Sequence, residues 1–166
     1  MTNCIFAQYK ITLNIISKIK APIKEEMNLF ENKFKNSLKS KTALLDSIMY
    51  YIIKRKGKQM RPMFVFLSAN LFGKVKEETY RAASMIELLH TATLVHDDVI
   101  DESDLRRGNK TTNAIWGNQS SILTGDYLLS RCFEIMVEDG DLEVLKLLSS
   151  TSSKIAQGEV LQLQHK

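Results

Sequence analysis

Apolar residues recur at every third or fourth position along most of the chain, a spacing that places them on one face of an α-helix. The first series follows Pro22 and comprises Ile23, Met27, Phe30, Phe34 and Leu38; the second comprises Leu44, Leu45, Ile48, Met49, Ile52 and Ile53. Gly57 permits a turn, and Pro62 then opens a third apolar segment that stops at Gly73. The pattern therefore predicts three helices before residue 73.

The segment from about residue 77 to residue 104 contains no glycine or proline and carries a broad apolar face. We expect one long, central and buried helix there. A loop follows at Gly108, then a short segment at residues 114–116, and two further helices over about 119–138 and 142–164, separated at Gly140. Because no stretch alternates as a strand would, the sequence predicts an all-α fold.

Composition narrows the class of protein. The chain has 166 residues, of which 44% are hydrophobic and 25% charged, so it holds enough apolar material for a core. Cys4 and Cys132 lack metal-ligand spacing, and we interpret both as thiols in a reducing compartment, which predicts a cytoplasmic protein. No apolar run approaches the roughly 18 residues of a membrane span, and the first residues do not match a signal peptide.

The charge pattern argues against a nucleic-acid partner. The net charge is +4, but acidic residues are interspersed with the basic ones, and a single basic run stands out at residues 54–61. That run suits a small polyanion or a solvated loop. Ile11, Ile15 and Ile19 form a stripe flanked by lysines, which fits a packing helix, a segment ordered against a partner subunit, or at most a peripheral membrane contact.

Five carboxylates gather near the C-terminal end of the predicted long helix, where the helix dipole disfavours negative charge. They belong to Asp97, Asp98, Asp101, Glu102 and Asp104. Asp97 and Asp101 are four residues apart and stack on one face, so their repulsion costs a few tenths of a kcal/mol unless a cation binds. Magnesium is the expected cation because it takes one or two carboxylates together with phosphate oxygens. A solvated acidic helix end, neutralised by nearby basic residues, is the alternative.

Basic residues converge on the same end of that helix. His90 lies seven residues before Asp97, and Arg106 and Arg107 follow the acidic cluster directly. Arginine makes bidentate contacts with phosphate oxygens, so two arginines beside a carboxylate-bound metal indicate a diphosphate clamp. By itself His90 would more often be a core residue.

Several motifs now resemble the trans-isoprenyl diphosphate synthases. Residues 97–101, DDVID, match that family's first aspartate-rich motif DDxxD, with ELLH before it at 87–90 and RRG after it at 106–108. Residues 57–62, GKQMRP, resemble the GKxxRP motif, and TTN, WGN and GDY at 111–113, 116–118 and 125–127 extend the likeness over residues 45–166. DDxxD alone is a weak signal, whereas the string from 87 to 108 is specific.

The resemblance implies a truncated helical bundle of the isoprenoid synthase type, with residues 1–43 as an N-terminal helical segment and residues 44–166 as the N-terminal half of the synthase domain. It implies a prenyltransferase that condenses isopentenyl diphosphate with an allylic diphosphate, giving a medium- or long-chain product for quinone side chains. Asp97, Asp98 and Asp101 would carry Mg²⁺, and with Arg106 they would be the catalytic residues. The implied binding residues are Lys58, Arg61, His90 and Arg107 for isopentenyl diphosphate, Arg106 and Gln162 for the allylic diphosphate, and Leu89, Ala92 and Thr93 for the growing tail.

This sequence departs from the family pattern in four places. Lys56, Gln59 and Lys110 stand where relatives often have glycine, arginine and proline, and a second aspartate-rich motif is absent from the 166 residues. We therefore expect the chain alone to be inactive, and to form a homodimer or pair with a C-terminal half.

Two other functions stay open at this point. A truncated, non-catalytic or regulatory subunit would keep the same motifs and bind a full-length synthase. An HD-type phosphohydrolase would use His96 and Asp97, but it needs further metal-binding histidines, and the chain has only His90, His96 and His165.

Overall fold

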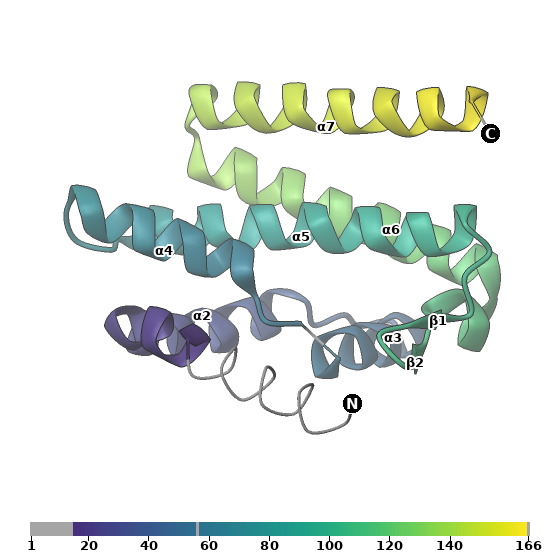
Figure 1. The fold of residues 1–166 in the computed structure, drawn as a ribbon, viewed down its shortest axis with the longest axis horizontal. Helices are drawn as coiled ribbons and strands as arrows, with labels where there is room; N and C mark the ends of the chain where they lie inside the picture. The colour runs from purple at the N-terminus through teal and green to yellow at the C-terminus, as the bar shows by residue number, and fades with distance from the viewer. Residues whose placement is uncertain (1–14, 56, 166) are drawn as a thin grey trace, which may run out of the picture.

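The computed structural model describes residues 15–55 and 57–165, and its described part is built almost entirely of helices (Figure 1). They are η1 (Ala21–Ile23), α2 (Lys24–Ser37), α3 (Ala43–Lys54), α4 (Met60–Phe72), α5 (Glu77–Ile100), α6 (Thr112–Asp139) and α7 (Leu142–Gln164). Two short antiparallel strands, β1 (Leu105–Arg106) and β2 (Asn109–Lys110), form a hairpin. The predicted all-α class is confirmed.

None of the described helices is long and apolar enough to cross a membrane. The predictions that involve Cys4, Ile11 and Lys56 fall outside the described residues.

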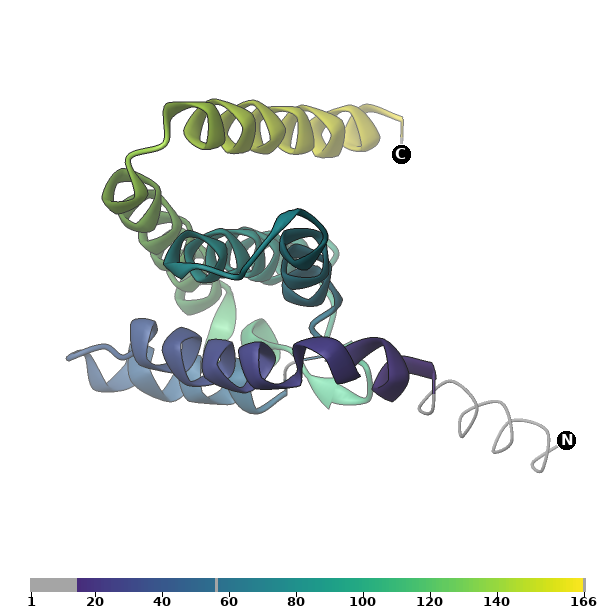
Figure 2. The same cartoon turned by 90° about the vertical axis from the view of Figure 1, so that its left-hand side faces the viewer.

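The helices lie in three layers, which two views at right angles both show (Figures 1 and 2). The middle layer holds α4, α5 and α6; α2 and α3 lie with the hairpin on one side, and α7 lies on the other. The core joins the apolar face of α2 to those of α4, α5 and α6, with Phe30, Phe66, Met85, Leu88 and Leu128 fully buried. Helix α5 is central, as its sequence predicts, and its C-terminal end reaches the hairpin.

Three helix boundaries differ from the sequence prediction. Helix α5 ends at Ile100 rather than near residue 104, because Glu102 adopts the left-handed conformation with φ of 50°. Helix α4 begins at Met60, two residues before Pro62, which lies in its first turn, where a missing N–H is tolerated. The short segment at 114–116 is the first part of α6, which kinks at Gly117, where φ is 81°. The ends of α4 at Gly73 and of α6 at Gly140 are confirmed.

Helix α7 contains no buried residue among those described. Val144, Leu145 and Leu148 near its start are partly buried against the core. The rest of its apolar side is exposed, as are several apolar residues of α6; the exposed set comprises Ile122, Leu123, Phe133, Val137, Leu142, Leu147, Ile155, Val160, Leu161 and Leu163. These surfaces are apolar enough to favour association.

Candidate functional site

A cavity of about 730 Å³ lies between α5, the ends of α2 and α3, the loop before α4 and the hairpin. Its apolar lining residues are Phe34, Leu38, Ile52, Ile53, Met60, Leu94 and Val95. Its charged lining residues are mainly basic. Of the residues that the sequence singles out, the structure brings Lys58, His90, Asp98, Arg106 and Arg107 to this cavity.

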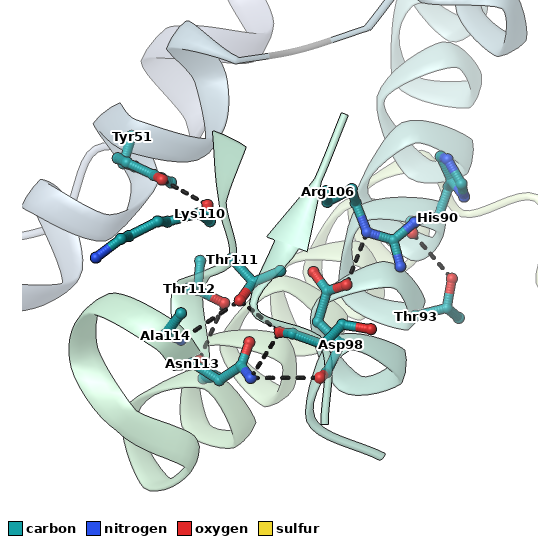
Figure 3. Close-up of polar contacts among 12 residues, drawn as sticks. Tyr51, His90, Thr93, Asp98, Arg106, Lys110, Thr111, Thr112, Asn113 and Ala114 are labelled. Atoms are coloured by element: carbon teal, nitrogen blue, oxygen red, sulfur yellow. Dashed lines mark hydrogen bonds and ion pairs between the residues drawn. The ribbon is translucent and has the colours of Figure 1, made fainter. Parts of the chain in front are cut away.

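Asp98 is the one aspartate of the 97–101 motif that lines the cavity, and it is paired with an arginine of the hairpin. The Arg106 Nε–H donates to Asp98 Oδ1 at 2.7 Å, and only 8% of the Asp98 side chain is exposed (Figure 3). The Asn113 side-chain amide donates to the backbone carbonyls of Asp98 and Ser103, which ties the start of α6 to the turn after α5. The helix end, the hairpin and α6 therefore meet at Asp98.

Asp97 and Asp101 do not line this cavity, so of the three motif aspartates only Asp98 reaches it. The reason is the helical period, since neighbouring residues are rotated by about 100° and Asp97 and Asp98 face different directions. Burial raises the pKa of Asp97, and the charges of Glu159 on α7, Asp101 and Asp98 raise it further, whereas Arg106 lowers it. Negative charge is therefore concentrated around Asp97.

This concentration of charge fits a divalent cation. Within the described residues no group of three or more His, Cys, Asp or Glu side chains is arranged to hold a metal ion by itself. Magnesium does not need such a group, because it keeps several waters and takes its remaining ligands from substrate phosphates. Asp97 and Asp101, one helical turn apart, offer the carboxylates for that mode of binding.

His90 lies in the cavity among positive charges. Burial lowers its pKa to about 4, and the guanidinium groups of Arg61, Arg107 and Arg106 contribute to the same shift. The imidazole is therefore neutral at pH 7. Arg61 does not line the cavity, but its charge reaches His90. A neutral histidine close to three arginine side chains indicates a site for an anion with several negative charges.

We predict that inorganic pyrophosphate raises the pKa of His90 from about 4 toward its ordinary value of about 6.5, because a bound anion neutralises the arginines. The measurement is an NMR titration of the imidazole Cε1–Hε1 signal with and without pyrophosphate, with His90→Gln to assign it. An unchanged His90 titration in saturating pyrophosphate would place the anion elsewhere.

In the ligand-free protein the folded pKa of His90 lies below the unfolded one, so the free energy of unfolding should fall as the pH drops from about 6.5 to about 4.

The hairpin turn holds Arg107 in an unusual conformation. Arg107 and Gly108 are the two turn residues, and both have positive φ, 53° and 76°. This is the pattern of a type I′ turn, whose first position favours asparagine, so an arginine there is strained. Gly57 leaves room for the arginine, because a Cβ at Gly57 would meet Arg107 Nη1. Gly57 is not among the described glycines with positive φ, so the space it leaves for this guanidinium is the structural feature seen at this position.

Replacing Arg107 with asparagine should therefore separate stability from anion binding. We expect the free energy of unfolding to rise by about 0.5–1 kcal/mol as the turn relaxes, and pyrophosphate affinity to fall about tenfold with the lost charge-assisted contact. Denaturant unfolding and calorimetric titration measure the two effects. Arg107→Lys is the control, because it keeps the charge and the strain. An Asn variant with undiminished affinity would contradict a role for Arg107 in binding.

His96 is engaged in packing α5 on α6. Its Nε2 lies 3.1 Å from the Ile122 carbonyl and 3.4 Å from a carboxylate oxygen of Asp126. The ring covers Gly125, where a Cβ would collide with the imidazole. Among the described residues no further histidine joins His96 and Asp97 in a metal-binding group. The HD-type phosphohydrolase hypothesis is therefore not supported.

Besides Asp97, Asp101 and Arg61, four further predicted site residues do not line the cavity. Gln162 is on the exposed side of α7, where its side-chain amide donates to Glu159 Oε1 at 3.4 Å. Ala92 is 3% exposed and belongs to the core, and Thr93 and Leu89 are partly buried without lining the cavity. The structure does not join the predicted tail residues to this cavity.

The cavity also contains polar residues to which the sequence analysis assigned no role. They include Tyr51 of α3, Arg55 at the C-cap of α3, and Asn109 of the hairpin. Arg55 belongs to the basic run at 54–61, and Asn109 follows the turn glycine, so both lie beside recognised motifs. The missing information was that α3 and the hairpin lie next to each other in space.

Comparisons with known proteins agree with this geometry. The family model described as polyprenyl synthetase matches residues 42–166. The all-trans-nonaprenyl-diphosphate synthase (geranyl-diphosphate specific) of Rhodobacter capsulatus is 42% identical over 147 residues, 88% of this chain and 45% of that protein. The octaprenyl diphosphate synthase of Escherichia coli strain K12 is 41% identical over 156 residues, 94% of this chain and 45% of that protein.

A solved structure extends the likeness to three dimensions. The polyprenyl synthase of Caulobacter crescentus CB15, complexed with calcium and isoprenyl diphosphate, superposes with a TM-score of 0.84 at 36% identity. The match covers 89% of this chain and 45% of the Caulobacter chain, so this chain spans just under half of the relatives it matches. From its motifs, its fold and these matches, the chain belongs to the polyprenyl synthetase family.

Proposed function

We propose that this chain provides the first diphosphate-binding half of a trans-polyprenyl diphosphate synthase. The reaction would condense isopentenyl diphosphate with an allylic diphosphate into a medium- or long-chain polyprenyl diphosphate, a precursor of quinone side chains. The observation that carries the proposal is the cavity in which neutral His90 lies among arginines, next to the acidic end of α5. Family membership and relatives named as nonaprenyl and octaprenyl synthases support it.

The two ends of the site would hold different anions. Lys58, His90 and Arg107 in the cavity, with Arg61 near it, would bind isopentenyl diphosphate. Asp97 and Asp101 would hold Mg²⁺, with Asp98 keeping Arg106 beside them, so that the allylic diphosphate binds at the helix end. When bound, magnesium supplies Lewis-acid stabilisation of the departing diphosphate. The arginines would add fixed positive charge where negative charge develops.

The direct test is binding of pyrophosphate to the purified chain with and without MgCl₂, followed by incubation with isopentenyl diphosphate and a labelled allylic diphosphate. We expect weak, magnesium-dependent binding and no extended product, because only one aspartate-rich motif is present in the 166 residues. Absence of pyrophosphate binding would refute the proposed site. Robust elongation by the chain alone would refute its being half of an enzyme.

The same assay separates the partner hypotheses. If a separately expressed C-terminal half of a relative restores elongation, pairing with such a half is supported. If the chain only alters the activity of a full-length synthase, the regulatory-subunit hypothesis is favoured. The exposed apolar sides of α6 and α7 support association of either kind, including a homodimer. A cytoplasmic location stays a prediction.

Product length stays a prediction tied to Ala92, Thr93 and Leu89. Ala92 lies five residues before Asp97, about 7.5 Å along the helix axis, where a large side chain would stop a growing tail. We expect Ala92→Phe to shorten the products of a reconstituted synthase, as chromatography of those products would show. Because Ala92 is 3% exposed, the same change should cost about 1–3 kcal/mol through overpacking. An unchanged product distribution in a folded variant would mean that residue 92 does not limit the length of the growing tail.

A further inference from the structure

The C-terminal end of α3 is fastened to the hairpin by contacts from two side chains. The Tyr51 hydroxyl donates to the Lys110 carbonyl at 2.5 Å, as Figure 3 shows. The Arg55 Nε–H donates to Asn109 Oδ1 at 3.1 Å. The Arg55 guanidinium carbon also lies 3.5 Å from the centroid of the Tyr51 ring. Tyr51 and Arg55, one helical turn apart on α3, therefore act on both residues of strand β2.

Strand β2 is the direct partner of the strand that carries Arg106. Asn109 pairs with Arg106 and Lys110 pairs with Leu105, and the turn between them carries Arg107. Each strand has only two residues, and an isolated two-stranded hairpin is at best marginally stable in water. The turn is also strained at Arg107. Outside contacts must therefore hold the hairpin in place, and α3 makes two of them.

We propose that Tyr51 and Arg55 are positioning residues that hold the arginine hairpin over the diphosphate cavity. The proposal rests on the proposed function and deepens it, because it assigns the placement of Arg106 and Arg107 to α3. Cation–π stacking fixes the plane of the Arg55 guanidinium, which leaves its Nε–H directed at Asn109. Trp116 packs edge-on against the Tyr51 ring, with 5.1 Å between the ring centroids, and keeps the tyrosine in place.

Helix α3 offers a matched control beside this pair. Tyr50 and Lys54 are the preceding residues in the same spacing, with Lys54 Nζ 5.9 Å from the Tyr50 ring centroid. Both are exposed, and neither is among the described residues that line the cavity. Tyr50→Phe thus removes a hydroxyl as Tyr51→Phe does, and Lys54→Arg makes the reverse of the Arg55→Lys exchange, both at residues that do not line the cavity.

The experiment compares these four variants with the unchanged chain by two measurements. Hydrogen exchange of the hairpin amides, read by NMR without ligand, reports whether the hairpin is held. Titration with magnesium and inorganic pyrophosphate reports the site. We expect Tyr51→Phe and Arg55→Lys to speed exchange in the hairpin and weaken pyrophosphate binding roughly threefold to tenfold, as the loss of one hydrogen bond implies, with the melting temperature unchanged. The two controls should change neither quantity.

Each other outcome overturns the idea in a recognisable way. Unchanged hairpin exchange in both variants refutes the positioning role, whatever happens to binding. Weakened binding with unchanged exchange would mean that Arg55 contacts the anion itself. Failure of the unchanged chain to bind pyrophosphate would refute the proposed function, while the exchange measurement would still test whether α3 holds the hairpin.

Asn109→Ala removes the Arg55 contact from the hairpin side, and it replaces Arg55→Lys if that variant does not fold. The fluorescence of Trp116, the only tryptophan, shows whether the aromatic packing is kept.

Discussion

Replacing Asp101 with alanine should reduce magnesium-dependent pyrophosphate binding at least about 100-fold, and Asp97→Ala should do the same. Both carboxylates lie one helical turn apart on a face where negative charge accumulates. Without either of them the helix offers the cation one carboxylate instead of two. The measurement is calorimetric titration of pyrophosphate at fixed MgCl₂. Metal-independent binding to the arginines should persist, which separates loss of the metal from loss of the whole site.

Stability should move in the opposite direction for Asp97. Its folded pKa is raised, so the folded protein favours the neutral carboxyl, and the ionised form is a cost at pH 7. Asp97→Ala should therefore leave the melting temperature level or higher at pH 7. The gain should vanish at a pH below the ordinary aspartate value of about 3.9, where the carboxyl is protonated in both states. Full magnesium-dependent binding in Asp101→Ala, or a clear loss of stability in Asp97→Ala at pH 7, would contradict the metal role.

The sequence predicted most of the fold because helix periods and glycine stops are local signals. Gly73 and Gly140 end helices where predicted, and the start of α7 after Asp141 is explained by its side chain, which accepts from the Glu143 and Val144 amides. The wrongly predicted helix boundaries lie where the φ angle of one residue decides the direction of the backbone. A left-handed Glu102 ends α5 early, and Gly117 bends α6 without ending it. Such angles depend on tertiary contacts that no periodicity records.

The site was predicted less completely than the fold. Lys58, His90, Asp98 and Arg107 could be found from motifs, and they meet at one cavity. The rotation of α5 about its own axis could not be found in this way, so the motif did not predict which of its three aspartates lines the cavity. The hairpin was missed because two-residue strands give no alternation. The hydrogen bond from Tyr51 to the hairpin could not be predicted either, because it joins residues 51 and 110, which are 59 positions apart in the sequence.

Asp98 should behave unlike the other two aspartates when it is replaced. Its side chain is 8% exposed and accepts from Arg106, so Asp98→Ala leaves the partly exposed Arg106 guanidinium without its counter-charge. We expect a loss of about 2–3 kcal/mol in the free energy of unfolding, at the lower end for a broken buried pair because the Arg106 side chain is 38% exposed. Chemical denaturation measures this loss, and faster amide exchange in the hairpin should accompany it.

The asparagine variant separates the two parts of that loss. Asp98→Asn keeps an oxygen that accepts from the Arg106 Nε–H but removes the charge, so it should cost about 1 kcal/mol and leave the hairpin in place. A denaturation series of Asp98→Ala, Asp98→Asn and Asp97→Ala should therefore rank in that order, from least to most stable. If Asp98→Ala were as stable as Asp97→Ala, the pair with Arg106 would contribute nothing to the fold. Asp98 would then have to be regarded as a third metal carboxylate, and its loss should cut magnesium-dependent binding as steeply as the loss of Asp101.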